Sequence, residues 1–426
     1  METTINAGTS TPRRRWRRVA AALAALALVA TAAACGDDDD GADTSSGSGG
    51  GSGSGSEDGG SAPSGEPLKI GVLVTTSGPL AALGNDQNTG MKMAAEELNE
   101  QGGILGRPIE LILKDDAGDP TKAAQGMREL IDREGVELVY GPTLSSSVLA
   151  ALAVSSPAKV VEMHSGSAED VSDAAKYPYG FRTAPNTVTQ TLTFVELAEE
   201  IGAERIGVLA VNQALGTSTV DNLKDALEGT DIELGGVEFF DIGAVDVTTQ
   251  AQKVKDAGAD LLIAAASGVG EYAAIVKARN QLDWDVPVAS FATMANPLVT
   301  EGAGGASAME GVYAGQVPLN FTDPLPQANA DWLERVRAEV GQDPLTRDIS
   351  QIAAGYDGLM MLAEAIEDAG EVDTDAIKAY FESNELEGLQ GTYTYDEDRH
   401  DGLSIESLTF VEAASFSDGT YVKADL

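Results

Sequence analysis

The sequence predicts an α/β protein whose folded part has two doubly wound lobes. Apolar runs typical of buried strands alternate with segments of helical spacing, and this alternation starts again near residue 205. Roughly 360 residues follow an N-terminal part that has few candidate core residues, which is enough chain for two cores. Alternating strands and helices predict parallel sheets that are covered by helices.

The first half of the folded part shows the alternation most clearly. Residues 70–74 (IGVLV) read as a buried strand, and residues 90–99 repeat apolar side chains at helical spacing. The expected elements are strands at residues 70–74, 109–113 and 136–140 and helices at residues 90–99 and 120–131. The second half repeats the pattern, with strands expected at residues 205–211, 260–265 and 286–290.

The chain is strongly acidic, with a formal net charge of -41. Nucleic acid is therefore not expected as a partner, because phosphate binding requires a basic face. Such an excess of carboxylates mainly confers solubility and says little about a ligand.

The N-terminus is typical of an exported protein. Arginines at positions 13–18 precede an apolar run at residues 19–30 that is too short to span a membrane comfortably. The following Ala32-Ala33-Ala34-Cys35 is similar to a bacterial lipobox, although Ala32 stands where leucine is usual. We expect residues 1–34 to be a lipoprotein signal peptide and Cys35, the only cysteine, to be lipidated. An ordinary signal peptide is the alternative.

Residues 35–66 are expected to form an acidic Gly/Ser tether, because such a composition cannot bury enough apolar surface to order itself. The folded body would then lie outside the cytoplasm, anchored by lipid to the outer face of the cell membrane.

Residues 141–147 (GPTLSSS) place three hydroxyls between an expected strand and an expected helix. Ligands of doubly wound folds bind beyond the carboxyl ends of strands, where helix N-termini favour anions and polar oxygens. The alternative is that one serine caps the helix and the others are solvated.

Several segments together resemble one known family. The residues that carry the resemblance are Ser77-Gly78-Pro79, Gly84, Gly90, Asn99, Gly102-Gly103, Gly106, Asp115-Asp116 and Asp119-Pro120, then GPTLSSS, FRTAPN at 181–186 and GYDGLMMLAEAI at 355–366. In this order and spacing they resemble the leucine/isoleucine/valine-binding group of extracytoplasmic solute-binding proteins, which have the type I periplasmic-binding fold. The resemblance covers residues 68–425.

The resemblance implies two Rossmann-like lobes joined by three crossover strands, near residues 184–186, 315–318 and 391–394. The N-terminal lobe would comprise residues 67–185 plus 316–391, and the C-terminal lobe residues 186–315 plus 392–426. A small solute would bind between the lobes, and the closed form would dock on an ABC permease and its ATPase. We expect a monomer that is not an enzyme and needs no cofactor or metal.

The resemblance also implies the ligand-binding residues. Polar groups would come from two loops of the N-terminal lobe, and the others would border the apolar part of the ligand or come from the second lobe. The residues are Ser145, Ser146, Ser165, Gly166, Ser167, Leu83, Leu215, Ser267 and Thr293.

One departure bears on the ligand. Amino-acid binders of this family meet the ammonium group with an acidic residue, and here Ala292 or Thr293 stands at the matching place. A buried ammonium without a counter-charge costs several kcal/mol. We therefore expect a carboxylate, an amide or a urea-like solute, although Glu271 could still supply the missing charge and allow an amino acid.

Besides solute import, the same fold could serve as a ligand-sensing receptor module that signals to a membrane partner, and the sequence does not separate the two functions. Residues 268–273 match G-x-G-x-x-A, but no acidic residue follows at the spacing that a dinucleotide site requires. Only two histidines occur and no nucleophile–base pair is evident, which argues against an extracellular enzyme.

Overall fold

The structure is a computed structural model that describes residues 63, 65–317, 319, 325, 327–347, 349–403 and 407–425. The expectations for residues 1–34, for Cys35 and for nearly all of the tether lie outside these residues. In the described part, no helix is both long enough and apolar enough to cross a membrane.

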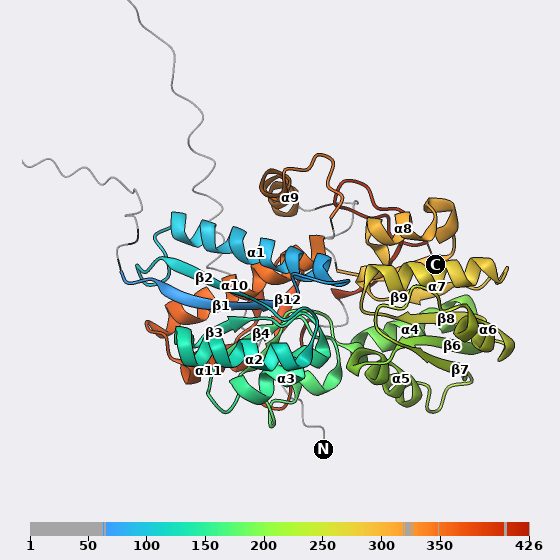
Figure 1. Cartoon of the computed structure of the whole chain (residues 1–426), viewed down its shortest axis with the longest axis horizontal. Coiled ribbons are helices and arrows are strands. Elements are labelled where there is room, and N and C mark those ends of the chain that lie inside the picture. The colour runs from blue at the N-terminus through green and yellow to red at the C-terminus, as the bar shows by residue number, and fades with distance from the viewer. Residues whose placement is uncertain are drawn as a thin grey trace, which may run out of the picture. The chain divides into compact units, whose positions relative to one another are not determined.

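A five-stranded parallel sheet with the order β2-β1-β3-β4-β5 forms the centre of the N-terminal lobe (Figure 1). Side chains alternate across β1: Ile70 and Val72 pack with α1 and α10, and Leu73 packs with α2 on the other face. The elements are β1 Leu68–Val74, α1 Ala81–Glu100, β2 Ile109–Asp115, α2 Pro120–Glu129, the π-helical turn Leu130–Glu134, β3 Leu138–Tyr140, α3 Ser145–Ser155, β4 Val161–His164, the 3₁₀ turn Glu169–Ser172, β5 Gly180–Arg182, α9 Gln327–Val340, α10 Ile349–Ala369 and α11 Thr374–Ser383.

A six-stranded sheet with the order β14-β10-β9-β8-β6-β7 forms the C-terminal lobe, and only β14 runs antiparallel to its neighbour. Ala264 of β8 packs in the cluster of α6, α7 and α8, whereas Ile263 packs toward α4 and α5. The elements are α4 Thr187–Ile201, β6 Arg205–Val211, α5 Ala214–Ala226, β7 Glu233–Phe240, α6 Thr248–Asp256, β8 Leu261–Ala265, α7 Val269–Gln281, β9 Val288–Ser290, the 3₁₀ turn Ala292–Ala295, α8 Pro297–Ala303, the 3₁₀ turn Ala306–Met309, β10 Val312–Gln316 and β14 Thr409–Glu412.

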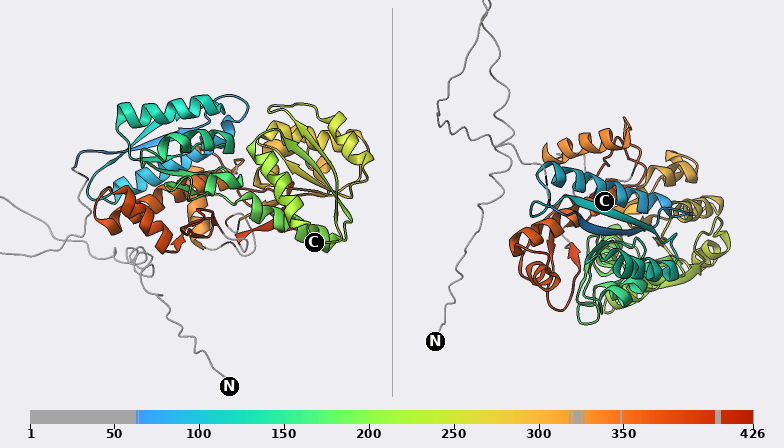
Figure 2. Two further views of the ribbon diagram at one scale, coloured as in Figure 1. Left: turned by 90° about the horizontal axis from the view of Figure 1, so that it is seen from below. Right: turned by 60° about the vertical axis from the view of Figure 1, so that its left-hand side comes forward.

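Each lobe gathers segments that are far apart in the sequence. In Figures 1 and 2 the blue α1 lies beside the orange α10, so the N-terminal lobe uses both early and late parts of the chain. The chain leaves this lobe after β5, returns after β10 and leaves it again before β14.

The last crossing lies later than the position near residues 391–394 that we expected from the sequence. A small sheet of β11 Leu386–Glu387, β12 Thr392–Thr394 and β13 Gly402–Leu403 intervenes, and Tyr393, Tyr395 and Leu403 are buried in the core of the N-terminal lobe. Asp357 of α10 holds this segment by accepting hydrogen bonds from Leu389 N, Gln390 N and the Tyr393 hydroxyl at 2.8, 3.2 and 2.9 Å. The chain therefore joins the second lobe only between Leu403 and Thr409.

Two glycines allow α1 and α10 to touch backbone to backbone. A Cβ atom at Gly90 would lie 1.8 Å from the Ile352 carbonyl oxygen, and one at Gly355 would lie 2.1 Å from the Gln87 carbonyl oxygen. Real Cβ atoms do not approach this closely, so any side chain at either position would force the helices apart.

We predict that Gly90→Ala lowers the stability of the protein by about 2 kcal/mol or more, because an overpacked contact strains its surroundings. Urea unfolding followed by circular dichroism measures the change. Gly270→Ala is the matched control, because Gly270 is exposed and its added Cβ would meet no atom within 4 Å. Equal midpoints for the two variants would contradict the prediction.

The Asp357 contact also predicts a pH dependence. Burial raises the pKa of the Asp357 carboxyl from 3.8 to about 6, although its hydrogen-bond donors act in the opposite direction. Between about pH 4 and pH 6 the folded state keeps a proton that the unfolded state has lost, so stability decreases as the pH rises through this window.

We therefore expect the stability of the wild type, measured relative to Asp357→Asn, to fall by about 2 kcal/mol from pH 4 to pH 6.5 and then to level off. Chemical unfolding at each pH measures the difference. Asp368→Asn alters an exposed residue of the same helix and should keep the wild-type profile. A difference that is constant or grows with pH would contradict this assignment.

Candidate functional site

A cavity of about 80 Å³ lies where strand ends of the two lobes face each other. The N-terminal lobe contributes residues that follow β3 and β4 together with one residue each of α1 and α10, and the C-terminal lobe contributes residues that follow β6, β8 and β9 and one residue of α7. The lining residues are Leu83, Thr143, Leu144, Ser145, Ser165, Ser167 and Gln351 from the first lobe and Gln213, Leu215, Ala266, Ser267, Tyr272, Phe291 and Thr293 from the second.

Seven of the nine ligand-binding residues predicted from the sequence lie on this wall: Leu83, Ser145, Ser165, Ser167, Leu215, Ser267 and Thr293. Ser146 does not line the cavity. Its Oγ accepts a hydrogen bond from Ala214 N at 3.4 Å and so connects α3 with the start of α5. Gly166 is also outside the wall, and a Cβ there would lie 3.0 Å from Val148 Cγ2 and 3.3 Å from Ser145 Cα. Its missing side chain lets the loop pack on α3.

Ser145 connects the two polar loops of the first lobe. Its Oγ accepts hydrogen bonds from Ser167 N and Ala168 N, both at 3.1 Å. Because both bonds use the lone pairs of the oxygen, the hydroxyl proton remains available to donate elsewhere. Ser145 therefore fixes the second loop as well as bordering the cavity.

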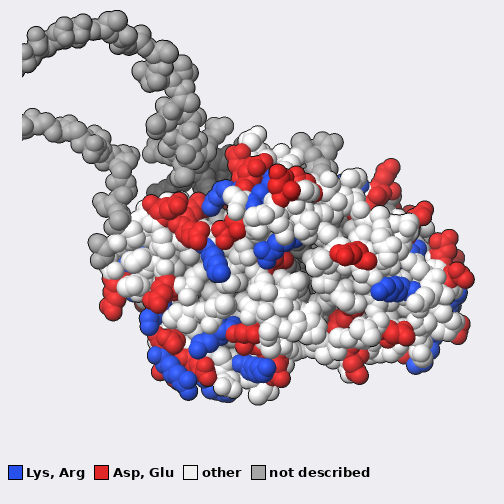
Figure 3. All heavy atoms as spheres, turned by 45° about the horizontal axis from the view of Figure 1, so that its top comes forward, with Lys and Arg blue, Asp and Glu red and all other residues white. Residues whose placement is uncertain are grey.

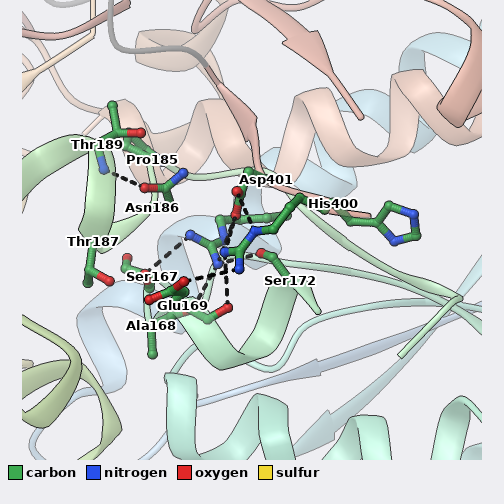
Figure 4. Close-up of polar contacts among 12 residues, drawn as sticks. Ser167, Ala168, Glu169, Ser172, Pro185, Asn186, Thr187, Thr189, His400 and Asp401 are labelled. Carbon is green, nitrogen blue, oxygen red and sulfur yellow. Dashed lines mark hydrogen bonds and ion pairs between the residues drawn. The ribbon is translucent and has the colours of Figure 1, made fainter. Parts of the chain in front are cut away.

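Arg182 also bonds to this loop, whose Ser167 and Ala168 are labelled in Figure 4. This fully buried guanidinium donates to the carbonyl oxygens of Ser167 at 3.2 Å and Ala168 at 2.8 Å and to Ser172 Oγ, and it lies 3.5 Å from Asp401. Burial lowers the pKa of Arg182 to about 10, so the group stays charged at neutral pH. Burial opposes ionisation of Asp401 as well, yet Arg182 and Arg399 hold the pKa of Asp401 below its ordinary value.

Glu271 has a comparable role in the second lobe. Its Oε2 accepts from Ser267 N at 2.8 Å and Gly268 N at 3.1 Å, and its Oε1 accepts from Gly243 N at 2.6 Å. The residue is buried and does not line the cavity. Its carboxylate is thus occupied by backbone donors at the start of α7, where the helix dipole also favours a negative charge.

Among the residues that the structure describes, the cavity wall carries no Asp, Glu, Lys, Arg or His, and Tyr272 is its one titratable residue. Burial raises the pKa of this phenol, whose hydroxyl donates to the Ala266 carbonyl oxygen at 2.7 Å. His164 is fully buried beside the loop, where burial and the charge of Arg182 hold its pKa well below the ordinary value. The wall therefore offers hydroxyls and amides next to the apolar Leu83, Leu215 and Phe291.

Sequence reasoning missed several wall residues. Thr143 and Leu144 belong to the GPTLSSS stretch, from which only serines were predicted to bind a ligand. Tyr272 lies within the G-x-G-x-x-A match. Phe291 directly follows β9 and Gln213 lies two residues after β6, so the preference of ligands for strand ends could have identified both. Gln351 lies on α10, far along the chain from the two serine loops, and no local signal pointed to it.

The described residues contain no group of three or more His, Cys, Asp or Glu that could hold a metal ion. Figure 3 shows acidic and basic side chains interspersed on the face that it draws, which differs from the continuous basic surface of nucleic-acid-binding proteins.

The sequence model described as "Periplasmic binding protein" matches residues 67–420. The chain belongs to the periplasmic binding protein family. Members of this family bind small solutes and work with ABC transporters, and they are not enzymes. Membership also implies a location outside the cytoplasm.

Individual relatives agree with this assignment. The chain is 26% identical over 332 residues, 78% of its length and 86% of the relative's, to the leucine-, isoleucine-, valine-, threonine- and alanine-binding protein of Pseudomonas aeruginosa. It is 29% identical over 213 residues, 48% of its length and 53% of the relative's, to Leu/Ile/Val-binding protein homolog 7 of Brucella suis.

Solved periplasmic binding proteins share the two-lobed fold. A solute-binding protein of an ABC transporter from Rhodopseudomonas palustris, in complex with 3,4-dihydroxybenzoic acid, matches with a TM-score of 0.73 and 20% identity over 84% of this chain and 96% of the other. A branched-chain amino acid binding protein from Streptococcus pneumoniae, in complex with isoleucine, matches with a TM-score of 0.72 and 21% identity over 84% and 100%.

We predict that Glu271→Gln lowers the free energy of unfolding of this periplasmic binding protein by about 1.5–3 kcal/mol. The amide keeps one acceptor oxygen and turns an NH₂ group toward backbone donors that bonded to a charged group before. Thermal and urea unfolding measure the loss. Glu301→Gln makes the same change at an exposed residue of α8 and should leave the free energy of unfolding nearly unchanged. Equal effects of the two variants would refute the role given to Glu271.

Proposed function

We propose that this protein captures a small solute between its two lobes and delivers it to an ABC permease and ATPase. The cavity lined by both lobes is the observation that carries the proposal. A ligand that contacts both lobes at once favours the closed arrangement, since only differential binding shifts a hinge equilibrium. We propose a monomer, since both lobes that line the cavity belong to one chain.

We propose further that Cys35 carries the lipid that anchors the protein outside the cytoplasm, with residues 36–66 as the tether. The basic and apolar N-terminal segments and the single cysteine after Ala34 support this arrangement.

The preferred solute, in this proposal, has no ammonium group. The described part of the wall has no charged side chain, and the carboxylate of Glu271 is already bonded to three backbone N–H groups. Removing an ammonium group from water without a counter-charge would cost several kcal/mol. A carboxylate with a short apolar body can be stabilised by the hydroxyl and amide donors of this wall, and an amide or a urea-like solute brings no charge that needs a partner.

The names of the relatives and the solved structures are compatible with a preference for a solute without an ammonium group. The Pseudomonas aeruginosa relative is named for amino acids, whereas the solved structures hold isoleucine in one case and 3,4-dihydroxybenzoic acid in the other. The shared fold therefore accommodates solutes with and without an ammonium group, and the residues of the wall decide between them.

A thermal-shift panel tests both parts of the proposal. The purified protein is unfolded and refolded to remove any carried-over solute, then mixed with branched and aromatic amino acids, their keto acids, short amides, urea and aromatic acids. A solute at 100 times its Kd should add about 2.7 kcal/mol of stability, which raises the Tm by several degrees. We expect ammonium-free solutes to produce the shift.

Thr293→Trp should abolish the shift, because the indole would fill a cavity of about 80 Å³. Thr249→Trp makes the same change at an exposed position of α6 and serves as the control. A shift by amino acids alone would contradict the ligand class, and the absence of any shift would contradict solute capture.

A further inference from the structure

A buried chain of hydrogen bonds lies behind the wall of the N-terminal lobe. It joins Thr75, Gln87, Thr143, Ser165 and Gln351, which come from five different parts of the lobe. Gln87 is fully buried at its centre. Each bond has a donor and an acceptor, so the direction of the chain determines which groups remain for a ligand.

One end of the chain is fixed by a backbone donor. The N–H of Thr75 donates to Thr143 Oγ1 at 3.2 Å, and a backbone N–H can only donate. Thr143 Oγ1 in turn donates its own proton to Gln87 Oε1 at 2.9 Å. The oxygen of the Gln87 amide is thereby directed toward Thr143.

The other end is fixed by a backbone acceptor. Ser165 Oγ donates to the Thr143 carbonyl oxygen at 3.4 Å, and a carbonyl oxygen can only accept. Ser165 Oγ therefore accepts from Gln87 Nε2, at 2.6 Å. With Gln87 Oε1 toward Thr143 and Nε2 toward Ser165, each donor at both ends of the chain faces an acceptor.

Gln87 passes this direction on to Gln351. The second N–H of Gln87 Nε2 donates to Gln351 Oε1 at 2.8 Å, so the oxygen of the Gln351 amide is used. Its Nε2 makes no hydrogen bond to another described residue, and Gln351 lines the cavity. Ser145 of the same cavity wall also keeps an unused proton, since its Oγ accepts two backbone N–H bonds.

We propose that Gln351 determines the specificity of the site by donating from Nε2 to an acceptor oxygen of the solute, with the Ser145 hydroxyl as a second donor. The head of the solute that faces this wall is then a carboxylate or carbonyl oxygen, and an ammonium head is rejected because it would meet donors only. This inference rests on the solute-binding function proposed above.

Three solutes with the same branched body test the inference: 3-methylbutanoate, 3-methylbutanamide and 3-methylbutylammonium. Calorimetric titration of the full-length wild-type protein should detect the first two and not the third. Gln351→Glu keeps an acceptor for Gln87 Nε2 and presents an anionic oxygen to the cavity. Its affinity for the carboxylate should fall roughly 10- to 100-fold and the ammonium should become a ligand.

Two features of the design separate specificity from folding. The amide should still bind to Gln351→Glu, because it can turn its own N–H toward the new oxygen. Gln281→Glu adds the same charge at an exposed residue whose Oε1 accepts from Thr248 Oγ1 at 3.2 Å, and it should bind as the wild type does. Gln351→Met should bind the carboxylate more weakly than the wild type does and should still not bind the ammonium.

The remaining outcomes are decisive as well. If Gln351→Glu prefers the same head group as the wild type, the inference is overturned, but solute capture still stands. A wild type that prefers the ammonium has the same consequence. The wild type could instead bind another solute of the wider panel. If Gln351→Glu then binds that solute with the same affinity as the wild type, the inference is overturned. If no solute binds at all, the proposed function and this inference both fail.

Discussion

The contact between α1 and α10 is the constraint on which the candidate site depends. Gly90 and Gly355 let the two helix backbones meet, and this brings Gln87 of α1 within hydrogen-bond distance of Gln351 of α10. With any larger residue at either glycine, the helices would separate by more than a hydrogen bond can span. A packing requirement between two helices thus decides which amide reaches the cavity.

Buried charges hold the polar loops in both lobes, but they stand behind the cavity and not on its wall. Arg182 bonds to carbonyl oxygens of one loop, and Glu271 bonds to N–H groups of another. A buried charge is tolerated when its hydrogen bonds are made, and in a low dielectric those bonds are strong. Because these charges are bonded to the loop backbones, they hold the loops in place while the described part of the wall stays neutral.

The sequence predicted the parts of the site that follow local rules. Strand-end serines such as Ser145 and Ser167 lie on the cavity wall because carboxyl ends of parallel strands meet at one edge of a sheet. Gln351 was not predicted, because its role comes from a helix contact made far along the chain. The last crossing was placed too early, because the hydrogen bonds of Asp357 to residues 389–393 leave no mark in the local pattern.

The fixed donors also give a reason for closure to depend on a solute. In a closed cavity without a partner, Gln351 Nε2 and the Ser145 hydroxyl would each lose a hydrogen bond, at a cost of about 1–3 kcal/mol per group. Water could satisfy them, since about 80 Å³ exceeds the roughly 10–15 Å³ that one molecule needs, but every ordered water costs entropy. In the proposed binding mode, a solute with acceptor oxygens satisfies both donors and buries its apolar body against Leu215 and Phe291. This mode therefore favours the closed state most for a solute whose head accepts hydrogen bonds.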